Sequence, residues 1–168
     1  MIEILRTDIT TLAVDAIVNA ANPALAGGGG VDRAIHRAAG PELVSASRAL
    51  APCPPGEAVI TPGFRLPARW VIHAVGPMWR GGAHGEAQLL RSAYDRSFAL
   101  ALAQDVASIA FPAISTGVYG FPKPLAAEIA IGAMRRHEPH LARIVACAFD
   151  AETEALYRGA LGAAANGG

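Results

Sequence analysis

Short apolar runs typical of β-strands alternate along the chain with longer segments of helical periodicity. This alternation is the strongest restriction on the fold, because it favours an α/β protein with a mostly parallel or mixed sheet and helices on both faces. The expected strands are Ile2 to Leu5, Ala16 to Val18, Glu57 to Thr61, Trp70 to Val75, Ser108 to Phe111 and Arg143 to Ala148. The expected helices are Val31 to Ala39, Pro41 to Leu50, Glu86 to Ala103, Pro124 to His137 and Glu152 to Leu161.

Composition and charge indicate one globular domain of 168 residues, 52% of them apolar. The 14 basic and 14 acidic residues cancel, which argues against a nucleic-acid partner or an anionic membrane surface. Two isolated cysteines, Cys53 and Cys147, and the lack of an apolar leader or membrane-length run predict a cytoplasmic protein. We expect the domain to span 1–162 and the low-complexity tail, 163–168, to be disordered.

Three loops follow expected strands, where open α/β sheets bind their ligands. The first contains Gly27 to Gly30 and leads into a helix, so its backbone N–H groups could surround an anion. Its spacing matches neither a dinucleotide fingerprint nor a P-loop, and a merely flexible turn is the alternative. The second loop is Ser115 to Gly120, and the third is Phe149 with Asp150.

Asp32, just after the glycines, has two interpretations. An acidic residue in the first helical turn stabilises the helix dipole, which is the structural explanation. A carboxylate beside a bound diphosphate would instead repel it by about 1 to 4 kcal/mol. Because a site selected only for affinity would omit such a group, a base or water-orienting role is the functional explanation.

Other candidates in these loops also have a structural alternative. Asn22 precedes a proline and could orient a hydroxyl or simply form a turn, whereas Asn19 is expected to face the other way and to be structural. Tyr119 could pack on a ribose or anchor its loop. Phe149 could stack on an adenine or belong to the core. Asp8 could accept from an exocyclic amine or cap a turn.

Two common kinds of active site are not supported. The five histidines form no His-x-x-x-His pair or His/Cys cluster, so we expect no bound metal. The Gly-x-Ser-x-Gly motif of serine hydrolases is absent from the sequence.

Taken together, the motifs resemble those of macrodomains, and most closely those of the MacroD-type branch. The similarity rests on Asn19-Ala20-Ala21-Asn22, on Gly27 to Asp32 and on Ser115 to Gly120. It extends from Asp8-Ile9-Thr10 through Val75-Gly76-Pro77 and Phe111 to Ile114 as far as Phe149-Asp150.

This resemblance implies a three-layer αβα sandwich around a mixed sheet, with a cleft for ADP-ribose and no cofactor. Asp8 and Ile9 would contact the adenine, and Phe149 would stack on it or line its pocket. The diphosphate would lie between two loops, and Tyr119 would flank the distal ribose. The residues implied around the diphosphate are Gly29, Gly30 and Val31 on one side and Ser115, Thr116, Gly117 and Val118 on the other.

The resemblance also implies catalysis by Asn22 and Asp32. Asp32 would orient or deprotonate a water, and Asn22 would hold the distal ribose hydroxyls. The implied activity is metal-independent hydrolysis of ADP-ribosyl esters, with O-acetyl-ADP-ribose or mono-ADP-ribosylated proteins as partners. A non-catalytic ADP-ribose reader is the alternative, and an RNA-binding module is a distant third interpretation that the neutral net charge disfavours.

The sequence departs from the family pattern at Thr7, Arg33 and Thr153. Arg33 matters most, since an arginine paired with Asp32 would lower the pKa of that carboxyl and weaken it as a base.

Overall fold

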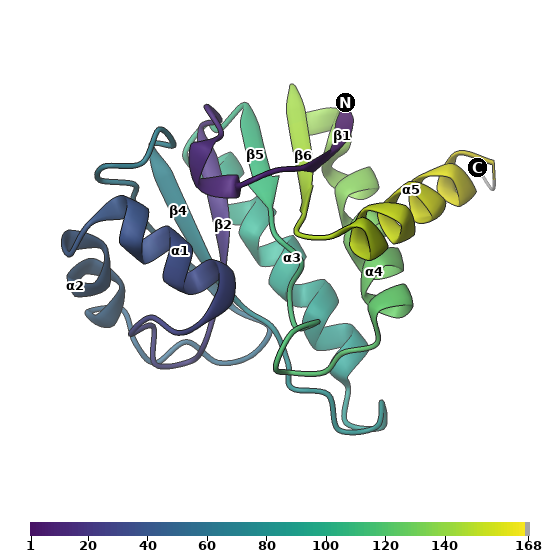
Figure 1. The fold of residues 1–168 in the computed structure, drawn as a ribbon, viewed down its shortest axis with the longest axis horizontal. Helices are drawn as coiled ribbons and strands as arrows, with labels where there is room; N and C mark the ends of the chain where they lie inside the picture. Colours follow the sequence, from purple (N-terminus) through teal and green to yellow (C-terminus); the bar gives the residue numbers. More distant parts are fainter. Residues whose placement is uncertain (167–168) are drawn as a thin grey trace.

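A six-stranded mixed sheet forms the centre of the molecule in the computed structural model, which describes residues 1–166 (Figure 1). The strand order is β1-β6-β5-β2-β4-β3; β3 pairs antiparallel with β4, and every other pairing is parallel. The strands are β1 Ile2–Arg6, β2 Ala16–Ala21, β3 Ala58–Pro62, β4 Trp70–Val75, β5 Ser108–Phe111 and β6 Arg143–Ala148.

Helices cover both faces of this sheet and give a three-layer αβα sandwich (Figure 1). They are α1 Gly30–Ala39, α2 Glu42–Arg48, α3 Glu86–Ala103, α4 Lys123–His137 and α5 Ala151–Asn166. Two short 3-10 turns, Ile9–Thr11 and Glu138–His140, precede β2 and β6. This architecture confirms the fold class expected from the sequence.

The alternation of side chains along β2 shows how the layers are built. Ala16 and Val18 point to a large core formed with α3, α4 and α5, whereas Ile17 points to a smaller core formed with α1 and α2. Because β2 is buried on both faces, it is apolar at nearly every position up to Asn19. Asn19 is therefore a polar group in the middle of a buried sheet, where it needs hydrogen-bond partners.

Several predicted boundaries differ from those observed. Strand β2 continues past Val18 to Ala21, and the predicted helix from Pro41 to Leu50 is shorter, since α2 ends at Arg48. Helix α5 continues beyond Leu161, so the expected disordered tail is helical as far as Asn166. Alanine, which fills much of this segment, is the best helix former and carries the helix past the apolar pattern. The last part of that tail, 167–168, lies outside the described residues.

The parallel strands place their carboxyl ends at one edge of the sheet. The glycine loop leaves β2 there, the Ser115 loop leaves β5, and Phe149 leaves β6. The segment after β1 that contains Asp8 reaches the same edge. Among residues 1–166, no helix combines the length and apolar character needed to cross a membrane.

Candidate functional site

A cleft of about 980 Å³ lies at the carboxyl edge of the sheet. It is bounded by the loops that follow β1, β2, β5 and β6, so segments distant in sequence share one ligand-sized space. Every site residue predicted from the sequence lines it: Asp8, Ile9, Asn22, Gly29, Gly30, Val31, Asp32, Ser115, Thr116, Gly117, Val118, Tyr119 and Phe149. The cleft also includes residues that were not assigned a ligand contact from the sequence, among them Thr7, Gly76, Lys123 and Cys147.

The glycine loop forms one wall of the cleft. Gly27 and Gly30 have φ angles of 85° and 60°, which L side chains rarely adopt. No side chain caps the start of α1, and a Cβ added to Gly29 or Gly30 would meet no atom within 4 Å. The unpaired N–H groups of the first helical turn therefore border open space, as an anion site requires.

The Ser115 loop forms the opposite wall and is held in a strained shape. Ser115 has a φ of 68°, and its buried Oγ has no hydrogen-bond partner within the protein. Backbone hydrogen bonds from Phe121 to Ser115 and from Gly120 to Gly117 close the loop at 2.9 and 3.0 Å. A Cβ on Gly76 would collide with Ser115 Oγ, so this glycine is required for close packing.

The end of the cleft near β1 and β6 combines apolar residues such as Ile9 and Phe149 with two acidic residues, Asp8 and Asp150. Phe149 is 96% exposed, which excludes the core interpretation and leaves its ring free to stack on a ligand. Asp8 Oδ1 accepts from the backbone N–H and the hydroxyl of Thr10, so Asp8 does cap a turn while it also lines the cleft. Burial, with the nearby Asp8 charge, raises the pKa of Cys147 to about 12, which keeps this thiol neutral.

Asp32 lies at the start of α1 and is only 4% exposed. Its Oδ1 accepts from Asn19 Nδ2 at 2.9 Å and lies 3.2 Å from His36 Nε2. Burial raises the pKa of this carboxyl above its ordinary value, against the opposing effects of the Asn19 hydrogen bond and the His36 charge. A carboxylate with a raised pKa is a stronger base than an exposed one.

Asp32 Oδ2 and the amide of Asn22 flank a common space over Gly28. A Cβ on Gly28 would lie 3.2 Å from Asp32 Oδ2 and 3.4 Å from Asn22 Nδ2. Asn22 Nδ2 donates to the carbonyl of Gly27 at 3.2 Å, whereas its Oδ1 has no partner within the protein. Asp32 Oδ2 and the Asn22 amide nitrogen thus face the space over Gly28, whereas Asn22 Oδ1 is buried.

The three departures from the family pattern have different surroundings. Arg33 is exposed, lies outside the cleft lining and makes no ion pair with Asp32 among the described residues. Thr7 lines the cleft beside Asp8. Thr153 also lines it, and its backbone N–H donates to Asp150 Oδ1 at 2.8 Å. Arg33 therefore does not weaken Asp32 as a base through an ion pair.

Sequence reasoning missed the residues behind Asp32. Asn19 was expected to face away from the site, but it contacts Asp32 directly. The expectation failed because Asn22 lies beyond the end of β2, where strand alternation no longer relates the two side chains. His36 and His73 were considered among the possible metal ligands, but not as neighbours of Asp32 and Asn19. The spacing of Asp32 and His36, which places both on one helix face, was the signal available for His36.

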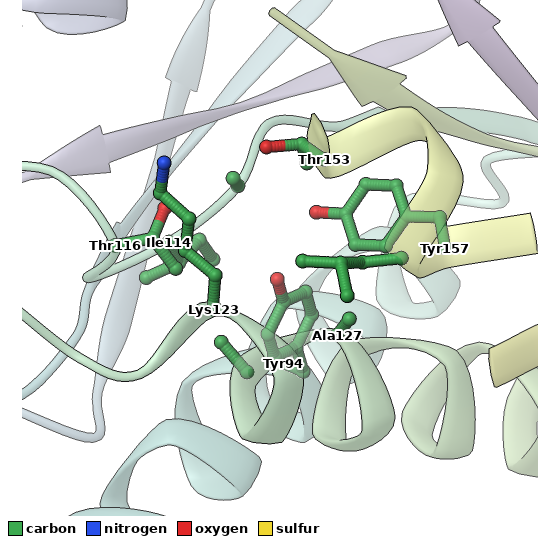
Figure 2. A pocket seen from close by; sticks show the side chains of 10 residues that line it. Tyr94, Ile114, Thr116, Lys123, Ala127, Thr153 and Tyr157 are labelled. Carbon is green, nitrogen blue, oxygen red and sulfur yellow. The ribbon is translucent and has the colours of Figure 1, made fainter. Parts of the chain in front are cut away.

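A second, much smaller cavity of about 10 Å³ adjoins the cleft (Figure 2) and shares five lining residues with it, Ala113, Ile114, Thr116, Lys123 and Thr153. The hydroxyls of Tyr94 and Tyr157 point into this space from α3 and α5 (Figure 2). Burial raises the pKa of both hydroxyls, so both are neutral. The cavity has the size of about one water molecule and is a packing feature below the cleft.

Comparison with known proteins supplies a family for this arrangement. The Macro domain family matches residues 18–130. A Macro domain-containing protein from Ralstonia nicotianae is 64% identical, over 94% of this chain and 92% of its own length. An O-acetyl-ADP-ribose deacetylase from Citrobacter rodentium is 59% identical, over 94% of this chain and 93% of its own. An Oceanobacillus iheyensis macrodomain solved with ADP has a TM-score of 0.94 and 39% identity, covering 99% of this chain and 92% of that one.

Proposed function

The chain belongs to the Macro domain family, and on this basis we propose that it hydrolyses ADP-ribosyl esters. The proposed substrates are O-acetyl-ADP-ribose and proteins that carry mono-ADP-ribose on an aspartate or glutamate. Both contain an acyl ester on the distal ribose, so one site would act on either. The name of the Citrobacter rodentium relative and the ADP in the Oceanobacillus iheyensis structure support this choice of ligand.

The shape and polarity of the cleft support one orientation of the substrate. The exposed ring of Phe149, with Asp8 and Ile9 nearby, suits the adenine. The diphosphate would lie between the first turn of α1 and the Ser115 loop, both of which offer backbone N–H groups. The distal ribose would then reach Asn22, Asp32 and Tyr119, with its ester beside Asp32 Oδ2.

The proposed reaction uses water as the nucleophile. Asp32 Oδ2, together with a substrate phosphate oxygen, orients a water and accepts its proton as the oxygen attacks the acyl carbon. The bond between the acyl carbon and the ribose oxygen breaks, and the ribose oxygen takes up the proton that Asp32 accepted and becomes a hydroxyl. Asn22 holds the ribose hydroxyls through its side-chain amide, whose nitrogen faces the space over Gly28. The products are ADP-ribose and a carboxylic acid.

The observation that carries this proposal is the state of Asp32. It is a buried carboxyl with a raised pKa whose Oδ1 is already bound and whose Oδ2 borders the cleft. A group that only stabilised the helix dipole would gain nothing from burial, since burial disfavours its charged form. A general base benefits from the same burial, because the raised pKa lies closer to the pH at which the base works.

The test is release of ADP-ribose from O-acetyl-ADP-ribose and, separately, from an automodified protein bearing mono-ADP-ribose on acidic side chains. Wild type should release it, and Asp32→Ala and Asn22→Ala should each be slower by roughly two orders of magnitude. Glu128→Gln, at an exposed position of α4, is the control and should match wild type. Equal release by wild type and the Asp32→Ala, Asn22→Ala double variant would rule out the enzyme.

A non-catalytic reader is the second candidate, because Phe149, Asp8 and the glycine loop could bind ADP-ribose without Asp32. Calorimetric titration with ADP-ribose separates the two functions. A reader should bind in the micromolar range, about 8 kcal/mol, and should show no turnover with either substrate. For a reader, Asp32→Ala should bind at least as tightly as wild type, because the substitution removes a charge that repels the diphosphate.

A further inference from the structure

A chain of buried polar side chains runs from β3 across the sheet to Asp32. Thr61 on β3, His73 on β4 and Asn19 on β2 are 3%, 1% and 0% exposed. Thr61 Oγ1 lies 3.0 Å from His73 Nε2, and His73 Nδ1 lies 3.2 Å from Asn19 Nδ2. The same Asn19 nitrogen donates to Asp32 Oδ1 at 2.9 Å. Of these four residues, Asp32 alone borders the cleft.

The direction of every hydrogen bond in this chain follows from Asp32. An ionised carboxylate only accepts, so the Asn19 group beside it must be the NH₂. The second N–H of that group then points at His73 Nδ1, which must carry a lone pair. The ring hydrogen is therefore on Nε2 and is donated to Thr61 Oγ1. The Thr61 hydroxyl donates in turn to the carbonyl of Pro62 at 3.2 Å.

Only a neutral His73 with its hydrogen on Nε2 satisfies all of these contacts. A protonated ring would place an N–H against the NH₂ of Asn19, with no acceptor between them. Burial, with the nearby His36 charge, lowers the pKa of His73 to about 3, in agreement with this assignment. The ring is thus held as an acceptor toward Asn19 throughout the neutral pH range.

The orientation of Asn19 depends on His73. Asn19 Oδ1 is buried and has no hydrogen-bond partner among the described residues, so only the NH₂ group holds the amide plane. If His73 Nδ1 did not accept, the amide could rotate, and Asp32 Oδ1 would lose its shortest contact. With His36 as the remaining contact of Oδ1, the carboxylate plane could then tilt, and Oδ2 would no longer be fixed toward the space over Gly28.

We propose that His73, held by Thr61, is a positioning residue that acts through Asn19 to keep Asp32 Oδ2 directed at the substrate. The inference rests on the hydrolysis proposed above, although neither His73 nor Thr61 touches the ligand. The chain crosses three neighbouring strands, β3, β4 and β2, so the rigidity of the sheet is passed to the carboxylate. Such outer hydrogen bonds orient the groups that do the chemistry.

Two pairs of matched variants test the proposal. In His73→Asn, the amide oxygen can replace Nδ1 as the acceptor for Asn19. In His73→Gln, the longer side chain places its amide at the position of Nε2, where it can hydrogen-bond to Thr61 but not to Asn19. Thr61→Ser keeps the hydroxyl that accepts the hydrogen bond from His73 Nε2–H, whereas the nearly isosteric Thr61→Val removes that hydroxyl. The kcat of His73→Gln and Thr61→Val should fall roughly tenfold to a hundredfold, with KM and the Kd for ADP-ribose within about twofold of wild type. His73→Asn should retain more of kcat than His73→Gln, and Thr61→Ser should retain most of it.

A second measurement does not require turnover. The Asn19 hydrogen bond lowers the pKa of Asp32, so its loss should raise that pKa further. Carbon-13 NMR titration of the Asp32 carboxyl should show this rise in His73→Gln and Thr61→Val but not in their matched partners, His73→Asn and Thr61→Ser. The thermal midpoint and the ADP-ribose Kd of each variant show whether it has folded.

The possible outcomes separate this inference from the proposed function. If wild type binds ADP-ribose but releases none from its esters, the proposed hydrolysis fails, while the titration still decides whether His73 orients Asp32. If wild type is active and folded Thr61→Val matches it in kcat and in the pKa of Asp32, the positioning role is wrong. An equal loss of kcat in Thr61→Ser and Thr61→Val would also overturn it, because the hydroxyl would then be irrelevant.

Discussion

The imidazole of His36 contacts Asp32 across one turn of α1, with Nε2 3.2 Å from Oδ1. Together with Asn19, it binds the one carboxylate oxygen that faces away from the cleft. The other oxygen is left without a hydrogen bond from the described residues. Hydrogen bonds therefore offset only part of the free-energy cost of burying this charge. We therefore expect the charge of Asp32 to be required for hydrolysis but not to stabilise the fold.

The first prediction is that Asp32→Asn abolishes hydrolysis without destabilising the protein. An asparagine can still accept from Asn19 through Oδ1, while its burial carries no cost for a charged form. Turnover should fall by roughly two to four orders of magnitude, and the thermal midpoint should equal or exceed that of wild type. Differential scanning calorimetry at pH 7 provides the measurement. A clear drop in the midpoint would indicate that Asp32 is a structural residue.

The second prediction concerns the pH dependence of kcat for O-acetyl-ADP-ribose. The proposed base must be ionised, and burial raises its pKa, so activity should decline on the acidic side at a pH above the ordinary Asp value of 3.8. Intrinsic tryptophan fluorescence at each pH separates this titration from unfolding. A rate that stays constant down to pH 4 in folded protein would contradict the role of Asp32 as a base.

Much of the fold followed from apolar patterning, since Trp70–Val75, Ser108–Phe111 and Arg143–Ala148 are strands with the predicted bounds. The loops that line the cleft were also predicted, because glycine-rich segments after buried strands gather at one edge of a parallel sheet. Patterning could not reveal the partners of Asp32. His73 lies in an apolar strand, and its contact with Asn19 depends on the pairing of β2 with β4, which local sequence does not encode.

The apolar pattern left the exposure of Phe149 open, and only the family resemblance implied a ligand-facing ring. The residue continues an apolar strand, so its hydrophobicity predicts burial, yet it lies just past the end of β6 and is 96% exposed. The surroundings of Arg33 could not be predicted from the sequence either. Its position next to Asp32 suggested an ion pair, but consecutive residues on a helix point about 100° apart.

The third prediction compares two adjacent glycines of the first loop. A Cβ on Gly28 would lie 3.2 Å from Asp32 Oδ2 and 3.4 Å from Asn22 Nδ2, whereas one on Gly29 would meet no protein atom within 4 Å. Gly28→Ala should therefore reduce kcat by crowding the space between the two proposed catalytic groups. Gly29→Ala should keep the stability of wild type, since Gly29 has an extended backbone with a φ of −97°.

Steady-state kinetics with O-acetyl-ADP-ribose and calorimetry with ADP-ribose distinguish the two variants. Any effect of Gly29→Ala should be confined to KM and Kd, because its methyl group could touch only the ligand. A reduced kcat in Gly29→Ala together with an unchanged kcat in Gly28→Ala would reverse the proposed geometry.

The fourth prediction concerns the loop that supports the Ser115 wall from outside. The backbone N–H of Trp79 donates to the carbonyl of Tyr119 at 2.8 Å, and the Trp79 ring packs edge-on against Phe121, with centroids 4.9 Å apart. The loop after Trp79 is tied to the start of α3 by Glu86. Its carboxylate accepts from the backbone N–H groups of Arg80, Gly82 and His84 at 2.9, 2.7 and 2.6 Å.

Burial alone would raise the pKa of Glu86, but these backbone N–H groups outweigh burial and lower it to about 2. Because the pKa is lower in the folded than in the unfolded protein, the unfolded chain binds more protons between the two values. The stability that Glu86 contributes is therefore complete above the ordinary glutamate pKa of 4.5 and is lost as the pH falls to about 2. Glu86→Gln should lose this part of the acid dependence, as urea unfolding at a series of pH values would show.

The same substitution should also weaken ligand binding. A glutamine presents an NH₂ group to one of the three backbone donors, so the loop cannot keep all of its bonds, and the support of Trp79 for Tyr119 weakens. We expect the Kd for ADP-ribose to rise several-fold and amide exchange to accelerate at Arg80, Gly82 and His84. Glu128→Gln, exposed on α4, should change neither quantity. Faster exchange in this loop with an unchanged Kd would show that the loop is tethered for its own stability and does not support the cleft.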